Sequence, residues 1–264
     1  MSGPAMNATF TGLEPVAVAM YLPASHEDFR DQLPLVNFYS KVASRLISTC
    51  LQSHGFDLTY PYVAQTYNWS DANSAFPDLE RISAAGLLTP SDFKGQRDWS
   101  PSIQGARRAE FDSWFGACRN SVGPINYEGV PEWASLESQW IKTDEQGNSD
   151  SHYQRLLTGF AECVRTADYE GTTPVTFLLG IDRLIQAPQQ AGRPISELQD
   201  ISLRAGKAYA RCYRVANAYR QKIRLDARRQ FMLRHWQDIR LAQQQLLVTV
   251  ARLSKESRVA YKAT

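Results

Sequence analysis

The stretch that decides the fold is KAYARCYRVANAYRQKIRLDARRQFMLRHWQDIRLAQQQLLVTVARLSKESRVAYKAT, residues 207–264. It contains neither glycine nor proline, and residues of high helix propensity dominate it. A straight helix over residues 207–262 would be about 84 Å long, whereas a compact chain of this size has a radius of gyration of about 18 Å. We therefore predict one long helix from Lys207 to about Arg252, which either projects from the body or bends.

Two apolar seams follow the three-and-four spacing of a packed helix through this region. The first is Leu198, Ile201, Ala205, Tyr209, Cys212, Ala216, Tyr219 and Ile223, and the second is Met232, Trp236, Ile239, Gln243, Leu246, Val250 and Leu253. The step of nine residues between them puts the seams on opposite sides of a straight helix. Different neighbours must then cover the two halves, and we place any kink between Arg224 and Phe231.

The second seam is the predicted partner-binding surface, because a body of this size cannot cover so long a helix. An exposed apolar stripe of that size marks an interaction site, and tryptophan is enriched among residues that dominate binding energy. Trp236 is the expected anchor. The alternative is that the amino-terminal arm or the helices of the body fold over the stripe. The predicted contact residues are Met232, Trp236, Ile239, Leu246, Val250 and Leu253.

The rest of the chain predicts an all-α fold with four segments. Prolines 4, 15, 23 and 34 predict an extended amino-terminal arm over residues 1–34. Helical spacing from Leu35 onward predicts a first helical part, residues 35–143, and a second, residues 151–205. The apolar-free segment DEQGNSD, residues 144–150, predicts the linker between them. Residues 206–264 form the long basic carboxy-terminal helix.

Charge is distributed unevenly along the chain. The formal net charge is only +2, but residues 204–264 hold fifteen Lys and Arg against three acids, and the preceding residues hold fourteen against twenty-four. Arg220, Arg224 and Arg228 recur at i, i+4 and predict a basic ridge that meets phosphate-bearing polymers, acidic lipid headgroups or an acidic protein. The alternative is an ordinary solvated basic face. No nucleic-acid-reading module is visible, so we do not expect nucleic acid as the partner.

The four cysteines, Cys50, Cys118, Cys163 and Cys212, lie on four separate predicted helices. There is no C-x-x-C pair and no histidine at zinc-finger spacing, so we expect no metal site. Two disulfides are the favoured interpretation, and four free core thiols are the alternative. Among the three connectivities we favour Cys50 with Cys118 and Cys163 with Cys212, because each pair then lies within one half of the chain, on one side of the predicted linker.

We expect that the chain as given neither spans a membrane nor carries an export signal of its own. The apolar run Pro15–Pro23 is far shorter than the roughly 20 residues of a membrane helix, and no basic residue precedes Arg30 to form a signal n-region. Met1–Met6 (MSGPAM) reads like a cloning remnant. We hypothesise that the natural export signal lies upstream, which inspection of the native reading frame would decide.

No catalytic signature stands out, so we expect no catalytic residue and no cofactor. There is no G-x-S-x-G, P-loop or Rossmann glycine pattern, and His26, His54, His152 and His235 are scattered. None of these histidines has a carboxylate or a second histidine at i, i+4. An enzyme with an unrecognised site and a cytosolic basic-helix nucleic-acid-binding protein remain the alternatives.

Four segments around the cysteines resemble a known family. They are TCLQSHGFDLTYPYV (49–63), FGACRNSV (115–122), GFAECVRTADYEG (159–171) and GKAYARCYRVANAYRQKI (206–223). Together they resemble secreted or lipid-anchored actinobacterial cell-envelope proteins of unknown function, which carry C-L/M-x-x-x-G-F/Y segments. Val164 and Ala167 depart from the methionine and glycine usual in the second such segment.

The resemblance implies an exported, disulfide-bonded helical protein that is either secreted or lipid-anchored in its native form, and it supplies no activity. We therefore expect a non-enzymatic, extracytoplasmic binding or scaffolding protein of a bacterial cell envelope. Its carboxy-terminal helix would bind a partner protein or a second copy of the chain, and an anionic envelope polymer or membrane surface is a further expected partner.

Overall fold

The computed structural model describes residues 13–62, 64, 76–88, 103, 105–122, 131–190 and 192–261. Within these residues the regular structure is helical and contains no strand, which confirms the all-α fold class. In chain order the helices are α2 (Leu13–Tyr21), α3 (His26–Ser53), α4 (Leu79–Ala85), α5 (Ala106–Val122), α6 (Pro131–Gln146), η2 (Gly147–Ser149), α7 (Ser151–Thr166), α8 (Pro174–Gln190), α9 (Ile195–Arg234) and α10 (Trp236–Ser257).

The amino-terminal segment is helical where extended chain was expected. Pro15 occupies the third position of α2, where the amide N–H would have no partner inside the helix, so it breaks no hydrogen bond. A capping box between Ser25 and Asp28 starts α3, which then runs through Pro34 to Ser53. The prediction of an extended arm is therefore wrong for residues 13–21 and 26–34, and residues 1–12 lie outside the described part. The cap and the packing of α3 outweigh the roughly 3 kcal/mol that an internal proline costs.

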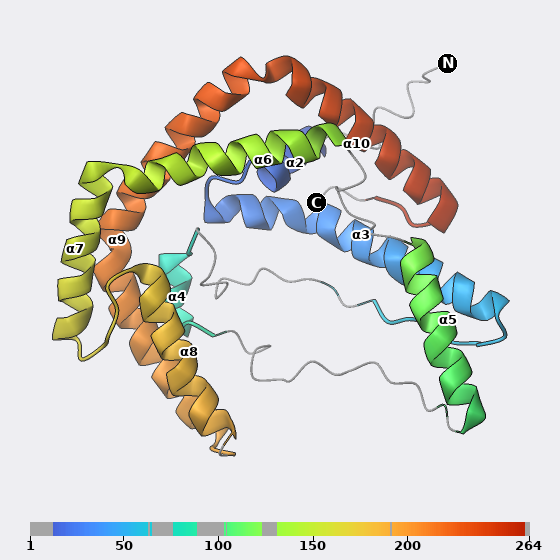
Figure 1. The fold of residues 1–264 in the computed structure, drawn as a ribbon, viewed down its shortest axis with the longest axis horizontal. Helices are drawn as coiled ribbons and strands as arrows, with labels where there is room; N and C mark the ends of the chain where they lie inside the picture. The colour runs from blue at the N-terminus through green and yellow to red at the C-terminus, as the bar shows by residue number, and fades with distance from the viewer. Residues whose placement is uncertain are drawn as a thin grey trace.

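The long carboxy-terminal helix is confirmed, but it begins earlier than predicted and bends later. α9 runs for 40 residues and α10 for 22, and the single residue between them, His235, has φ −114° and ψ 22°. The His235 amide donates to Phe231 O at 3.0 Å, and the Ile239 amide donates to His235 O at 2.9 Å. The chain therefore bends without a loop, beyond the predicted interval from Arg224 to Phe231. Figure 1 shows α9 and α10 as the two arms of an arch.

Three clusters of buried side chains hold the helices together. The first core joins α2, α3, α6 and α10 around residues such as Tyr21, Leu35, Trp133, Trp140 and Leu246. The second joins α4, α7, α8 and α9, and the third joins the end of α3 to α5. The two predicted helical parts are therefore not separate: α10 completes the core of the first part, and α4 packs on α9 in the core of the second.

The predicted linker, residues 144–150, is an ordered turn. α6 continues to Gln146, and η2 follows directly. Asp150 then caps α7, because its Oδ1 accepts from the amides of His152 at 2.9 Å and Tyr153 at 2.8 Å. The prediction of a linker is thus wrong: these polar residues serve helix ends and, as described next, a buried ion pair.

Candidate functional site

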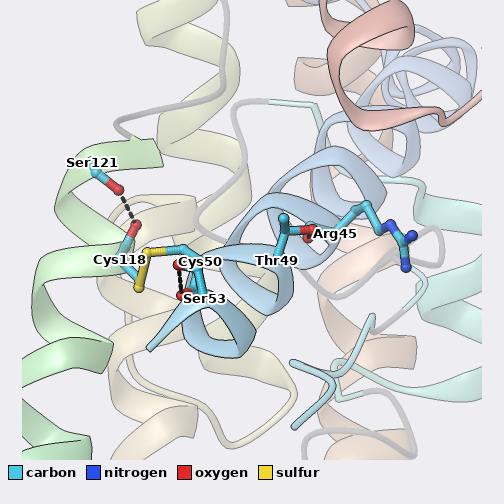
Figure 2. Close-up of a disulfide and its surroundings, with 6 residues drawn as sticks. All are labelled: Arg45, Thr49, Cys50, Ser53, Cys118 and Ser121. Carbon is cyan, nitrogen blue, oxygen red and sulfur yellow. Dashed lines mark hydrogen bonds between the residues drawn. A yellow bond between two sulfur atoms is a disulfide. The ribbon is translucent and has the colours of Figure 1, made fainter. Parts of the chain in front are cut away.

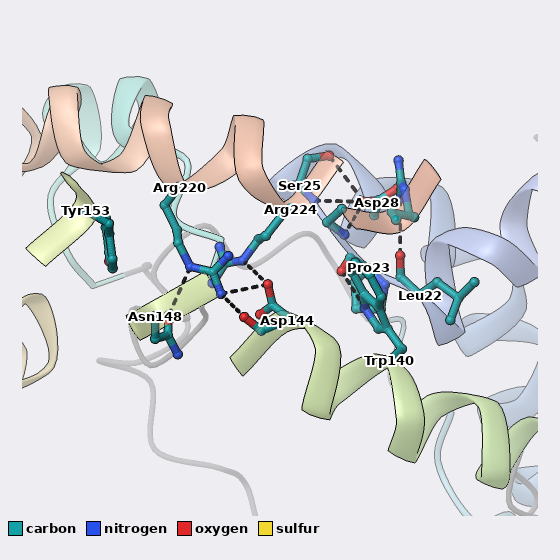
Figure 3. Close-up of polar contacts among 12 residues, drawn as sticks. Leu22, Pro23, Ser25, Asp28, Trp140, Asp144, Asn148, Tyr153, Arg220 and Arg224 are labelled. Carbon is teal, nitrogen blue, oxygen red and sulfur yellow. Dashed lines mark hydrogen bonds and ion pairs between the residues drawn. The ribbon is translucent and has the colours of Figure 1, made fainter. Parts of the chain in front are cut away.

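The predicted basic ridge, Arg220, Arg224 and Arg228, lies inside the molecule. Arg220 is fully buried and Arg224 nearly so, while Arg228 is half-buried. Their i, i+4 spacing on α9 places Arg220 and Arg224 on the face that α6 and η2 cover (Figure 3), and Arg228 bonds to Asp28 at the start of α3. They are therefore not available to a phosphate-bearing polymer or a lipid headgroup, and the prediction of an exposed ridge is wrong.

Arg220 and Arg224 share one carboxylate. Asp144 Oδ1 accepts from Arg220 Nη2 at 2.7 Å and from Arg224 Nε at 2.8 Å. Arg220 Nη2 also donates to the main-chain oxygen of Asp144, and Arg220 Nε donates to Asn148 Oδ1 at 2.9 Å. We call Asp144, Asn148, Arg220 and Arg224 the polar joint, because they tie the middle of α9 to the turn between α6 and α7 (Figure 3).

The polar joint holds two positive charges against one negative charge. Burial lowers the pKa of Arg220, the neighbouring charge of Arg224 lowers it further, and Asp144 opposes both effects. Arg224 lies 4.3 Å from the ring centroid of Phe76, where a cation interacts favourably with the aromatic face. Within the described residues Arg220 Nη1 has no hydrogen-bond partner. The joint is an anchor between elements, and both of its positive charges pair with Asp144.

Arg228 makes a second buried anchor. Its Nη1 donates to both oxygens of Asp28, at 2.9 and 2.8 Å, and to Leu22 O at 3.2 Å. Asp28 also accepts from the amides of Ala24 and Ser25 at 2.8 Å each, which completes the cap of α3. One carboxylate therefore starts α3 and fixes its position on α9.

The predicted partner-binding seam is also largely buried. Ile239, Leu246, Val250 and Leu253 lie in the first core, where α2, α3 and α6 cover α10. Met232 is half-buried against the same core, and only Trp236 is exposed, at 55%. The prediction of an outward-facing stripe is therefore wrong, because the bend at His235 lets the body reach both arms of the long helix.

A different set of charged side chains faces outward along α9. We call it the outer basic stripe. Its members recur at the spacing of one helix face and lie roughly 180° around the axis from the buried residues Ala205, Tyr209 and Ala216. All are exposed, and none makes an ion pair within the part of the chain that the structure describes. The stripe is Arg204, Lys207, Arg211, Arg214, Lys222 and Arg229.

The cysteines form the two disulfides that were favoured. Cys50 pairs with Cys118 and Cys163 with Cys212, with Cα–Cα distances of 5.7 and 5.5 Å. The first joins α3 to α5 and the second joins α7 to α9. In three cases a hydroxyl three residues later donates to the carbonyl of the cysteine: Ser53 to Cys50 at 2.7 Å, Ser121 to Cys118 at 3.0 Å and Thr166 to Cys163 at 2.7 Å (Figure 2 shows the first two). Each hydroxyl thus satisfies an acceptor near the end of its helix.

His54 lies beside the first disulfide. A nitrogen of its ring and the sulfurs of Cys50 and Cys118 all lie within 4.8 Å of one another. The imidazole stacks on Trp114, with ring centroids 3.4 Å apart and an interplanar angle of 14°. His54 and Cys50 are half-buried and Cys118 is buried, so the group lies at the edge of the third core.

Comparison with known proteins finds no match. No protein-family model, no curated protein and no solved structure is similar to this chain. Among the described helices, none is both long enough and apolar enough to cross a membrane. What the protein does must therefore be argued from its own geometry.

Two signals in the sequence could have found the residues that were missed. The first seam defines the buried face of α9, so the positions opposite it, such as Arg204, Lys207 and Arg211, are the ones that face solvent. Cys50 and His54 are four residues apart near a helix end, a spacing that brings two side chains together on one face. By contrast, nothing in the local sequence pairs Asp144 with Arg220, because 76 residues separate them.

Proposed function

We propose that this protein is a non-enzymatic, extracytoplasmic scaffold of a bacterial cell envelope, and that it binds a phosphate-bearing polymer along the outer basic stripe. The stripe is the observation that carries the proposal. It places six positive charges over about 38 Å of helix, roughly one per 7 Å. A row of positive charges along one helix face suits a flexible polyanion, which can follow the helix axis and release its counterions on binding.

The disulfides support an extracytoplasmic location, because such bonds form and persist in oxidising compartments. The resemblance of the cysteine segments to actinobacterial envelope proteins points the same way. The buried arginines support the choice of stripe: because the three arginines on the inner face of α9 pair with Asp144 and Asp28, the side chains of the outer basic stripe carry exposed positive charge that makes no ion pair within the described residues.

Polyphosphate of defined length is the probe that tests polymer binding. The triple variant Lys207→Gln, Arg211→Gln, Arg214→Gln should weaken binding about tenfold, since exposed charge contacts contribute roughly 0.2–1 kcal/mol each. Binding of the unchanged protein should also weaken steeply as salt is raised. Fluorescence anisotropy with labelled polyphosphate measures both effects.

A matched triple controls for net charge. Arg45→Gln, Arg165→Gln, Arg183→Gln removes the same charge from exposed positions on α3, α7 and α8. This variant should bind polyphosphate almost as well as the unchanged protein. Equal losses in the two triples would show that only net charge matters, and a strong preference for RNA over polyphosphate would favour the nucleic-acid alternative.

The compartment is tested on protein from its native source. Intact mass after alkylation under denaturing conditions, without a reductant, should show no modified cysteine. Four alkylated thiols would contradict both the disulfides and the extracytoplasmic assignment.

A further inference from the structure

The disulfide between Cys50 and Cys118 has a third potential metal ligand beside it. His54 follows Cys50 by four residues at the end of α3, and its ring lies within 4.8 Å of both sulfurs. Thiolate sulfur and imidazole nitrogen are the ligands that zinc prefers. Trp114 covers the face of the imidazole, and the nitrogen lone pairs lie in the ring plane, so the stack orients the ring without blocking its nitrogens.

We propose that Cys50, His54 and Cys118 form a redox-gated zinc site: the oxidised pair is the disulfide, and the reduced pair with His54 binds a zinc ion. Two thiolates and one imidazole leave one position of a tetrahedral ion for water. This inference does not depend on the proposed polymer binding, since it concerns the far end of α3 and α5.

A dithiol supplies the electrons that convert the disulfide into the zinc-binding form. The dithiol gives two electrons to the bond between Cys50 Sγ and Cys118 Sγ and becomes a disulfide itself. The two sulfurs of the protein leave as thiolates and bind Zn²⁺, and the two protons of the dithiol pass to solvent. Oxidation of the pair reverses these steps and releases the ion, so metal binding and the disulfide exclude each other.

The ends of two helices favour a cation at this place. Cys50 lies three residues before the end of α3, and Cys118 lies four residues before the end of α5. The carboxy-terminal end of a helix carries a partial negative charge, which stabilises a nearby cation. Ring contacts between Phe56 and Phe111 and between Tyr60 and Phe115 also join α5 to the segment that follows α3. Part of the third core therefore remains when the sulfur bond opens, and a zinc ion would replace the lost covalent link.

The second disulfide provides an internal control. Within the described residues, Cys50, His54 and Cys118 form a group of three potential ligands whose atoms lie close together, and no such group includes Cys163 or Cys212. A zinc ion that needs a third ligand should therefore distinguish the two pairs in the same molecule.

Cobalt(II), which has a visible spectrum, is the probe for the reduced full-length chain. After anaerobic reduction with tris(2-carboxyethyl)phosphine, one equivalent should give a thiolate-to-cobalt charge-transfer band, which zinc then removes. His54→Gln should weaken binding at least tenfold, while the matched variant His152→Gln should leave it unchanged. The oxidised chain should give no such band.

Alkylation in the presence of zinc gives a second readout that assigns the ligands. Peptide masses should show Cys50 and Cys118 protected and Cys163 and Cys212 modified. Equal protection of both pairs, binding unaffected by His54→Gln, or absence of the band would each overturn the proposal. So would a reduced chain that loses its helical circular dichroism and does not regain it when zinc is added.

Discussion

At the residue scale, Asp144 joins two helices through a single carboxylate oxygen, a role that the local sequence did not predict. Its Oδ1 accepts hydrogen bonds from two buried arginines, Arg220 and Arg224. Removal of one partner from a buried ion pair is strongly destabilising, because the remaining charge stays buried without compensation. The carboxylate of Asp144 thus stabilises the fold chiefly by compensating the charges of the two buried arginines.

Asp144→Asn should lower the free energy of unfolding by about 3 kcal/mol, since the amide keeps the shape of the side chain and loses its charge. Urea denaturation followed by circular dichroism measures the change. Glu145→Gln, at the exposed neighbouring position, should change stability by less than about 0.5 kcal/mol. If the two variants unfold at the same urea concentration, the polar joint does not anchor α9.

The environment of Asp78 predicts that the stability of the fold depends on pH. Burial would raise the pKa of this carboxyl, but the amide of Arg81 and the charges of His26 and Arg30 hold it below its ordinary value. Asp78 caps α4 through Arg81 and pairs with Arg30 at 2.8 Å. Because the pKa is lower in the folded state than in the unfolded state, the ionised form stabilises the fold. That contribution is complete above the unfolded value of about 3.9 and is lost as pH falls through the folded pKa.

Asp78→Ala should therefore destabilise the protein by about 1 kcal/mol or more at pH 7, the usual effect of removing a helix cap. The difference from the unchanged protein should shrink as pH falls below about 4. Urea denaturation at several pH values tests this expectation. Glu80→Ala, at an exposed position in the same turn, should show no comparable loss at either pH.

At the scale of the elements, α10 has one buried and one exposed face. Leu246 is fully buried in the first core, whereas Val248, two residues later, is 65% exposed. The same helix therefore offers a direct test of whether the seam is core or interface. Leu246→Ala should cost about 2–5 kcal/mol, and Val248→Ala should cost less than about 0.5 kcal/mol.

Thermal unfolding and sedimentation together distinguish the two cases. A large loss of stability with no change in association state is the outcome that burial requires. If Leu246→Ala instead leaves stability unchanged and dissociates an oligomer, the body does not cover the seam. The seam of α10 would then be a partner-binding surface.

At the scale of the whole molecule, the two disulfides differ in how much the helix that each one attaches depends on it. Within the part of the chain that the structure describes, the third core contains five buried residues, Ile47, Leu51, Phe56, Phe111 and Cys118, and α5 relies on it together with its disulfide. α7 has the larger second core, in which Tyr153 and Phe160 pack against Tyr213. Each link closes a long loop, with sequence separations of 68 and 49, and is worth about 4 kcal/mol in the chain-entropy view.

The double variant Cys50→Ala, Cys118→Ala should therefore make local unfolding of α5 more frequent while leaving the other helices unchanged. Hydrogen exchange followed by mass spectrometry should show faster exchange in residues 106–122 and little change in residues 151–166. Cys163→Ala with Cys212→Ala is the matched variant, and its exchange should stay slow in α7 because the second core remains. Unchanged exchange in α5 would mean that the third core holds this helix without its link.

Much of the architecture could be predicted from local patterns. The apolar spacing and the lack of glycine and proline after residue 207 predict the long helix, and the placement of the cysteines predicts both disulfides. The prediction of the helix succeeds because helix formation and the facing of residues along one helix depend on neighbours three and four positions away. The disulfide pairing was favoured instead from the order of the cysteines on the two sides of residues 144–150.

Which face of a helix is buried was decided by the tertiary structure. The sequence alone determined that Arg220, Arg224 and Arg228 share a face and that Leu246 and Val250 share another. It did not determine that Asp144 and Asp28, far away in the chain, form ion pairs with the first set, or that α2, α3 and α6 cover the second. The physical reason is that the period of a pattern is local, whereas burial and ion pairing depend on which distant elements pack against it. The outer basic stripe became visible only when those partners had been placed.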